Sequence, residues 1–149
     1  MKGQPLRPPG VRVVKFLYTI GLGPIVGRLV LLLTTTGRKS GLPRVTALQY
    51  EEVDGAIYLG SSKGTHADWF QNLVANPCVS VRVKTRQFSG IAEPVTDPRR
   101  IADFLELRLK RHPQMVGMIF MAEGLSATPS RAELETYARQ LAMVIIRPM

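Results

Sequence analysis

The sequence is poor in the residues that build disulfide frameworks and metal sites. Its 149 residues include a single cysteine, Cys78, and two histidines, His66 and His112. A single cysteine cannot form an intramolecular disulfide, and a zinc site needs Cys or His ligands at short spacings. We therefore expect neither a disulfide nor a metal site, and the composition is compatible with a reducing compartment.

Long apolar runs are also missing. The longest uncharged stretch near the N-terminus, residues 16–27, is interrupted by Gly21, Gly23 and Pro24, whereas a membrane-spanning helix needs about 20 apolar residues. No alanine precedes Ala47, so a signal peptide would lack the usual small-residue cleavage site. These features predict a cytoplasmic protein.

Acidic residues are absent before Glu51. The same segment carries eight Lys and Arg residues, so most of the net charge of +9 belongs to the first third of the chain. This asymmetry indicates an anionic partner, which could be nucleic acid, a membrane surface or an acidic small molecule. Nucleic acid is disfavoured, because the bases are not interleaved with stacking aromatics and no helix-turn-helix or zinc-finger spacing occurs.

The length and the 45% content of hydrophobic residues fit one ordinary domain. Residues 1–10 contain three prolines and two glycines and are predicted to form a flexible basic arm. We expect residues 11–149 to form a single domain that opens with a short amphipathic helix over 11–20.

Apolar and alternating patterns predict the strands, and Asp54-Gly55 is a strong hairpin signal. The predicted strands cover residues 29–36, 45–53, 56–60, 79–83, 87–95 and 143–147. Six mostly antiparallel strands with peripheral helices are typical of an α+β protein built on a barrel.

Capping signals predict the helices. A helix around residues 69–74 should end before Asn76-Pro77, because a residue in front of proline avoids helical geometry. Asp97-Pro98 starts a second helix that His112-Pro113 stops, and a capping box at Ser130 starts a third, which runs to about residue 140. The apolar segment 115–121 is either a helix lining a pocket or ordinary core.

Two motif matches have weak structural support. Ser62 stands in a G-x-S-x-G pattern, with Asp97 and His112 in hydrolase order, but α/β-hydrolases need a larger and mostly parallel sheet. The glycines within residues 21–27 are interrupted by proline and follow no predicted strand, so a dinucleotide loop is disfavoured.

A dense cationic loop separates the first two predicted strands. The segment Gly37-Arg-Lys-Ser-Gly-Leu-Pro-Arg44 places three cations, a hydroxyl and two glycines within eight residues. Many N–H and cationic donors around one small volume suit a phosphate or carboxylate. From these residues alone, an anion site and a tight turn with solvated charges are equally supported.

Four segments share a joint pattern with one enzyme family. They are LLTTTGRKSGLPRV at 32–45, DG at 54–55, GSS at 60–62 and HADWFQNLVANP at 66–77. In this order and spacing they resemble the deazaflavin-dependent nitroreductases, also called coenzyme F-420-dependent quinone reductases. The resemblance implies a split β-barrel, related to flavin reductases and pyridoxamine-phosphate oxidases. It further implies hydride transfer from reduced deazaflavin to a quinone, nitroaromatic or activated alkene.

The resemblance also implies where coenzyme F-420 binds. This cofactor carries a phosphodiester and a polyglutamate tail, which the basic loop would hold, whereas the segment after the third strand would contact the deazaflavin ring. The implied cofactor-binding residues are Arg38, Lys39, Ser40, Arg44, Ser61, Ser62, Lys63, Gly64 and Trp69. Packing beneath the loop is favoured over direct contact for the tryptophan. No catalytic residue is assigned, and Ser61, a pocket water or solvent could supply a proton.

The C-terminal third departs from the family pattern. Nitroimidazole-reducing members have a tyrosine-bearing segment that walls the substrate pocket, whereas this chain has the Met-rich segment 115–121. The acceptor is therefore not implied. Two alternatives stay open: an FMN- or haem-binding protein of the same fold, and a non-enzymatic fatty-acid carrier. A homodimer and contact of the basic N-terminal segment with the inner face of the membrane are further expectations.

Overall fold

The computed structural model describes Arg12 and residues 30–149. The predicted arm over 1–10, the helix over 11–20 apart from Arg12, and the glycine segment 21–27 lie outside the described residues. In chain order, the described elements are β1 (Leu31–Thr36), β2 (Pro43–Leu48), β3 (Glu51–Val53), β4 (Ala56–Ser61), the 3-10 turn η1 (Gly64–His66), α3 (Asp68–Ala75), β5 (Cys78–Val83), β6 (Arg86–Val95), α4 (Pro98–Arg111), α5 (Pro113–Ala122), α6 (Arg131–Ala138) and β7 (Ala142–Pro148).

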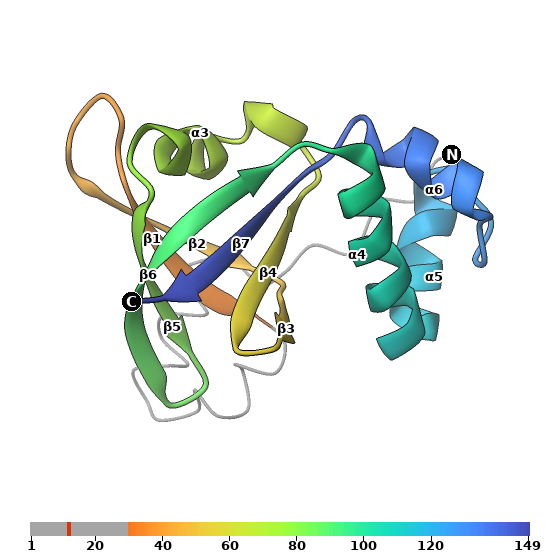
Figure 1. Cartoon of the computed structure of the whole chain (residues 1–149), viewed down its shortest axis with the longest axis horizontal. Helices are drawn as coiled ribbons and strands as arrows, with labels where there is room; N and C mark the ends of the chain where they lie inside the picture. Colours follow the sequence, from red (N-terminus) through yellow and green to blue (C-terminus); the bar gives the residue numbers. More distant parts are fainter. Residues whose placement is uncertain (1–11, 13–29) are drawn as a thin grey trace.

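The seven strands that the structure describes form one curled sheet in the order β2-β1-β5-β6-β7-β4-β3 (Figure 1). Every neighbouring pair is antiparallel, as predicted. The prediction of a single strand over 45–53 is wrong, because the chain is divided there at Gln49-Tyr50 into β2 and β3. The division is required because β2 pairs with β1 and β3 pairs with β4, at opposite ends of the sheet.

The hairpin between β3 and β4 turns at Asp54 and Gly55, as predicted. Both residues have positive φ, 50° and 82°. Two successive left-handed residues give the turn whose twist matches antiparallel strands, and Asp and Gly accept this conformation readily. The local sequence therefore determines this connection.

Strand β7 is buried on both faces and separates two hydrophobic clusters. Val144 and Ile146 belong to the cluster inside the curled sheet, which α3 covers through Phe70. Met143 and Ile145 point the opposite way and belong to the cluster beneath α4, α5 and α6. Alternation with a period of two therefore places successive β7 side chains in different cores.

The predicted helix starts are confirmed. The Asp97 side chain accepts a hydrogen bond from Arg99 N (2.9 Å) at the start of α4, and the helix ends at His112. Ser130 and Glu133 form the predicted capping box of α6, although the helix ends at Ala138 rather than near residue 140. Among the described residues, no helix combines the length and apolar character needed to cross a bilayer.

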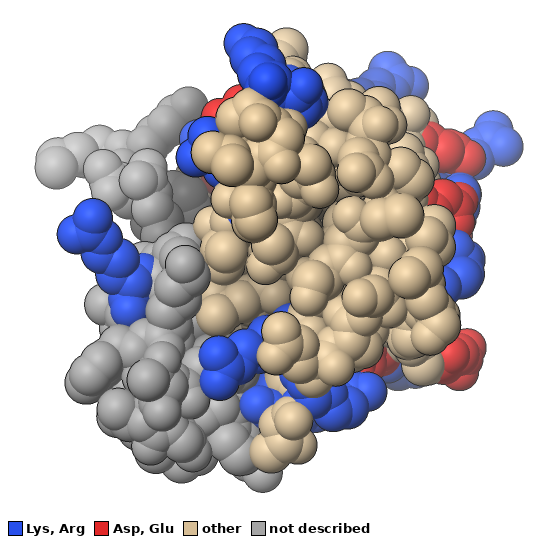
Figure 2. All heavy atoms as spheres, turned by 90° about the vertical axis from the view of Figure 1, so that its left-hand side faces the viewer, with Lys and Arg blue, Asp and Glu red and all other residues tan. Residues whose placement is uncertain are grey.

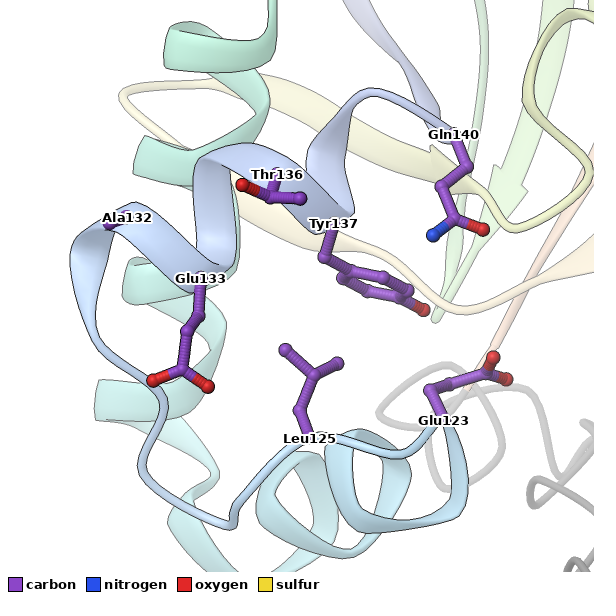
Figure 3. Close-up of a pocket in the computed structure, with 7 residues that line it drawn as sticks. All are labelled: Glu123, Leu125, Ala132, Glu133, Thr136, Tyr137 and Gln140. Atoms are coloured by element: carbon purple, nitrogen blue, oxygen red, sulfur yellow. The ribbon is translucent and has the colours of Figure 1, made fainter.

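The Met-rich segment forms helix α5, and only part of it is core. Val116 and Phe120 are buried, whereas Met118 and Met121 are 59% and 60% exposed. The expectation of ordinary core is therefore wrong for these two methionines and right for Phe120. A cavity beside α5 is lined by residues that follow this segment, Glu123 and Leu125, and by residues of α6 (Figure 3).

Candidate functional site

The predicted site residues lie along one edge of the molecule. In Figure 1, the β1–β2 loop, α3, the η1 turn and the end of α6 that leads into β7 follow one another across the upper half. Neighbours in this row are in contact, since Arg38 of the loop bonds to α3 and Gly64 of the turn packs against Gln140 after α6. Segments from distant parts of the chain thus form one continuous edge.

The β1–β2 loop is closed by its own backbone. Gly37 N donates to Leu42 O (2.8 Å), and Gly41 N donates to Gly37 O (2.8 Å). Ser40 Oγ accepts from Leu42 N (3.2 Å) and from Arg44 Nη2 (3.4 Å). A Cβ at Gly37 would lie 2.6 Å from Ser40 Oγ, so this tight closure depends on glycine. The loop therefore presents its cationic side chains from a defined backbone.

Arg38 fastens the loop to α3. Its Nη1 donates to Asn72 Oδ1 (2.8 Å), its Nη2 lies 3.1 Å from Asp68 Oδ1, and its backbone N also donates to Asn72 Oδ1 (3.2 Å). Asn72 is buried and in turn donates to Thr35 Oγ1 (3.3 Å). The Arg38 side chain is only 26% exposed. Arg38 therefore uses Nη1 and Nη2 to hold the loop against α3.

Lys39 and Arg44 remain available to a ligand. Both are exposed, and the Lys39 ammonium has no hydrogen bond or ion pair with another described residue. Figure 2 shows Lys and Arg side chains gathered at the top and bottom of this side of the molecule, with uncharged surface between them. The β1–β2 loop lies at the top of this side in Figure 1 and the β5–β6 turn at its bottom. Uncharged surface therefore separates the positive charge of the β1–β2 loop from that at the β5–β6 turn (Figure 2).

The segment after β4 forms the second part of the site. Ser61 is 3% exposed, and its Oγ donates to Gly64 O (2.7 Å). The hydroxyl is thus engaged within the segment, so in this conformation Ser61 is not free to give a proton to an acceptor. Ser62 and Lys63 are exposed between these two residues. Trp69 is half-buried and packs on the core edge-to-face with Phe70 (centroids 6.2 Å apart), in agreement with a supporting role.

Gly64 reveals a neighbour that sequence reasoning missed. Its φ is +58°, and a Cβ there would lie 2.8 Å from Gln140 O. The contact arises because β4 pairs with β7, with Ser61 opposite Ala142. No local signal links residues about 75 positions apart, so only the strand pairing could have revealed it. The segment after α6 therefore borders the site.

The serine-hydrolase constellation is not assembled. Asp97 and His112 cap opposite ends of α4, a helix of 14 residues, which places them about 20 Å apart at 1.5 Å per residue. His112 Nε2 instead lies 3.2 Å from Oε2 of the buried Glu51 on β3, which also pairs with two arginines of α4. These groups tie α4 to the sheet.

The curled antiparallel sheet with its covering helices is a split β-barrel. A Listeria innocua protein assigned as a pyridoxamine 5′-phosphate oxidase shares the fold, with a TM-score of 0.55, 14% identity and coverage of 91% of this chain and 93% of that chain. The family model described as F-420H(2)-dependent quinone reductase matches residues 12–115, which include both parts of the site. The chain belongs to this family.

Two further relatives agree with this membership. An F-420H(2)-dependent quinone reductase of Mycobacterium tuberculosis is 41% identical over 68 residues, which are 44% of this chain and 46% of that protein. The chain thus spans about half the length of the curated relatives it matches. The solved structure of an F-420-H2 dependent reductase, FDR-A, has a TM-score of 0.54 and 28% identity over 80% of this chain and 93% of that chain.

Proposed function

We propose that this protein is an oxidoreductase that transfers a hydride from reduced coenzyme F-420 to a small organic acceptor, such as a quinone, nitroaromatic or activated alkene. The observation that carries the proposal is the family match over residues 12–115, which includes the cationic loop and the Ser61–Gly64 segment. The names of the relatives point to the same cofactor.

The described residues fit an elongated anionic cofactor. Lys39 and Arg44 are exposed cations on a loop of defined shape, which suits the phosphodiester and carboxylates of the tail. Ser62 and Lys63 stand at the next position along the same edge, where the ring would lie. Arg38 supports this site indirectly, because it holds the loop against α3. Ser40 acts in the same way through its hydroxyl, which accepts from the loop backbone.

The chemistry divides between cofactor and protein. Bound deazaflavin supplies the hydride. The protein binds and orients the cofactor and keeps water from the reacting atoms. The Ser61 hydroxyl shapes the Ser61–Gly64 segment by donating to Gly64 O, and the buried glycine allows this segment to lie against the backbone of Gln140. Solvent or a pocket water supplies any further proton.

An absorbance assay tests the proposal. Adding the protein and menadione to reduced F-420 should restore the visible absorbance of the oxidised cofactor, and NADH or NADPH should not replace it. A panel of quinones, nitroaromatics and activated alkenes guards against an unsuitable acceptor. Absence of turnover with the whole panel, together with no F-420 binding and a flavin or haem spectrum of the purified protein, would refute it. A co-purified fatty acid without a chromophore would indicate the carrier instead.

The assembly and location of the protein stay predictions. A homodimer would appear as twice the monomer mass of 16.5 kDa in sedimentation equilibrium. The predicted cytoplasmic location is tested by cell fractionation. Contact of the basic N-terminal segment with the inner membrane face predicts co-sedimentation with anionic vesicles that weakens when the arm over residues 1–10 is deleted. The single domain over 11–149 requires one cooperative unfolding transition.

A further inference from the structure

Two buried polar side chains meet where β1 leads into the β1–β2 loop. Thr35 on β1 is 2% exposed and Asn72 on α3 is 4% exposed, and Asn72 Nδ2 donates to Thr35 Oγ1 (3.3 Å). Burying such groups costs free energy unless each is hydrogen-bonded. Neither residue belongs to the cofactor-binding set that the family resemblance implies. The pair therefore has no assigned role, although it joins two elements of the site.

The Asn72 amide can hold the loop in only one orientation. Its Oδ1 accepts from the Arg38 backbone N (3.2 Å) and from Arg38 Nη1 (2.8 Å). Both groups are donors only, so Oδ1 must face the loop and Nδ2 must face β1. A reversed amide would place its own N–H groups against these two donors. The Thr35 hydroxyl, which accepts from Nδ2, therefore stabilises the orientation that holds the loop.

The loop has a fixed shape, but its place against α3 depends on few contacts. Two backbone hydrogen bonds close the loop on itself. Among the described residues, Arg38 alone joins the loop to α3 by hydrogen bonds, to Asp68 and Asn72. The Asp68 side chain is 88% exposed, and an ion pair that water can reach contributes little. The buried amide is therefore the contact that sets the place of the loop.

The positions of Lys39 and Arg44 depend on this placement. Lys39 follows Arg38 directly, and Arg44 pairs with Thr35 across the β1–β2 ladder. Residues directly opposite each other in such a ladder share one face of the sheet. A binding group must be held within about 0.5 Å of its productive position. A small shift of the loop against α3 would therefore displace both cations from the phosphodiester and carboxylates of the tail.

We propose that Thr35 is a positioning residue for the anionic tail of coenzyme F-420. Its hydroxyl orients the Asn72 amide, and this amide holds Arg38 and with it the loop. Because Thr35 is buried, it acts on affinity without touching the ligand. The inference rests on the proposed function and adds to it a residue that determines how tightly the cofactor binds.

Removing the Thr35 hydroxyl tests this role. Thr35→Val keeps the shape of the side chain and suits a strand, but it cannot accept from Asn72. The Kd for F-420 should rise about threefold to tenfold, the usual effect of one neutral hydrogen bond, whereas kcat at saturating F-420 should stay at the wild-type value. Thr35→Ser retains the hydroxyl and should restore the wild-type Kd. The matched control is Thr34→Val, the same change on the opposite face of β1, which should leave the Kd unchanged.

The loop can also be followed without cofactor. In the cofactor-free protein, the amide NMR signals of residues 38–41 should shift in Thr35→Val and stay in place in Thr34→Val. Asn72→Leu removes the amide altogether, so it should weaken F-420 binding at least as much as Thr35→Val. Asn72→Asp keeps oxygens that accept from Arg38 and should recover part of this loss. If Thr35→Val fails to fold, Thr35→Ala removes the same hydroxyl.

Four results would overturn the positioning role. They are an unchanged Kd without the hydroxyl, an equal rise of the Kd in Thr35→Ser, an equal rise in Thr34→Val, and unchanged NMR signals of residues 38–41 in Thr35→Val. Wild type that does not bind F-420 would instead refute the proposed function. The NMR signals of the cofactor-free loop would still decide whether Thr35 fixes its position.

Discussion

Replacing Lys39 should separate cofactor binding from loop stability. The backbone bonds that close the β1–β2 loop do not involve this side chain, and Lys39 has no partner among the described residues. Its removal therefore leaves no buried group unpaired, and the loss should appear only in binding. A hydrogen bond to a charged group contributes about 1.5–3 kcal/mol, and 1.4 kcal/mol corresponds to a factor of ten. Lys39→Ala should therefore weaken F-420 binding at least about tenfold.

A fluorescence titration of F-420 at two salt concentrations measures this change. Raising the ionic strength from 0.1 M to 1 M shortens the Debye length from about 10 Å to about 3 Å, so wild type should lose more affinity than Lys39→Ala. The control is Lys110→Ala, which removes the same charge from an exposed position on α4. Equal affinities of wild type and Lys39→Ala would refute the reasoning, as would an equal loss in Lys110→Ala.

Four further substitutions follow from the structure. Arg38→Ala should lower the free energy of unfolding by about 1–3 kcal/mol in urea denaturation, because the charged hydrogen bond to a buried amide on α3 is lost. Gly64→Ala should cost at least about 1–2 kcal/mol, because the left-handed φ is strained and the new Cβ meets the backbone of Gln140. Met118→Trp should leave the free energy of unfolding within about 0.5 kcal/mol of wild type, since this side chain is largely exposed. The pKa of Tyr137 is raised from 10 to about 12, so the protonated phenol stabilises the folded protein fully below pH 10 and this stabilisation is lost as the pH rises to about 12. The free energy of unfolding of Tyr137→Phe should therefore depend less on pH over this range than that of wild type.

The elements determined by local chemistry could be predicted from the sequence. The Asp54-Gly55 hairpin, the Asp97 cap of α4 and the Ser130 capping box each depend on side chains within a few residues of one another, and all three are present. The division of the predicted strand over 45–53 could not be predicted. It results from pairing with partners at opposite ends of the sheet, and apolar alternation continues across the break.

The candidate site could also be predicted only in part. The cationic loop is visible as a local cluster of charge, but nothing local distinguishes Arg38 from Lys39. Their difference arises from Asn72, which lies 34 positions from Arg38 and whose Oδ1 accepts a hydrogen bond from the Arg38 guanidinium. The contact between Gly64 and Gln140 likewise depends on strand pairing across most of the chain. Sequence patterns therefore indicate the candidate residues, whereas the contacts that distinguish Arg38 from Lys39 are visible only in the tertiary structure.

The charges along the upper edge favour one orientation of the cofactor in the proposed complex. Lys39 and Arg44 are exposed at the loop, whereas Glu123 and Glu133 line a cavity between α6 and the turn after α5. A tail with several negative charges is attracted to the loop and repelled from the cavity. The tail is therefore expected at the β1–β2 loop, with the ring at the next position along the edge, near Ser62 and Lys63.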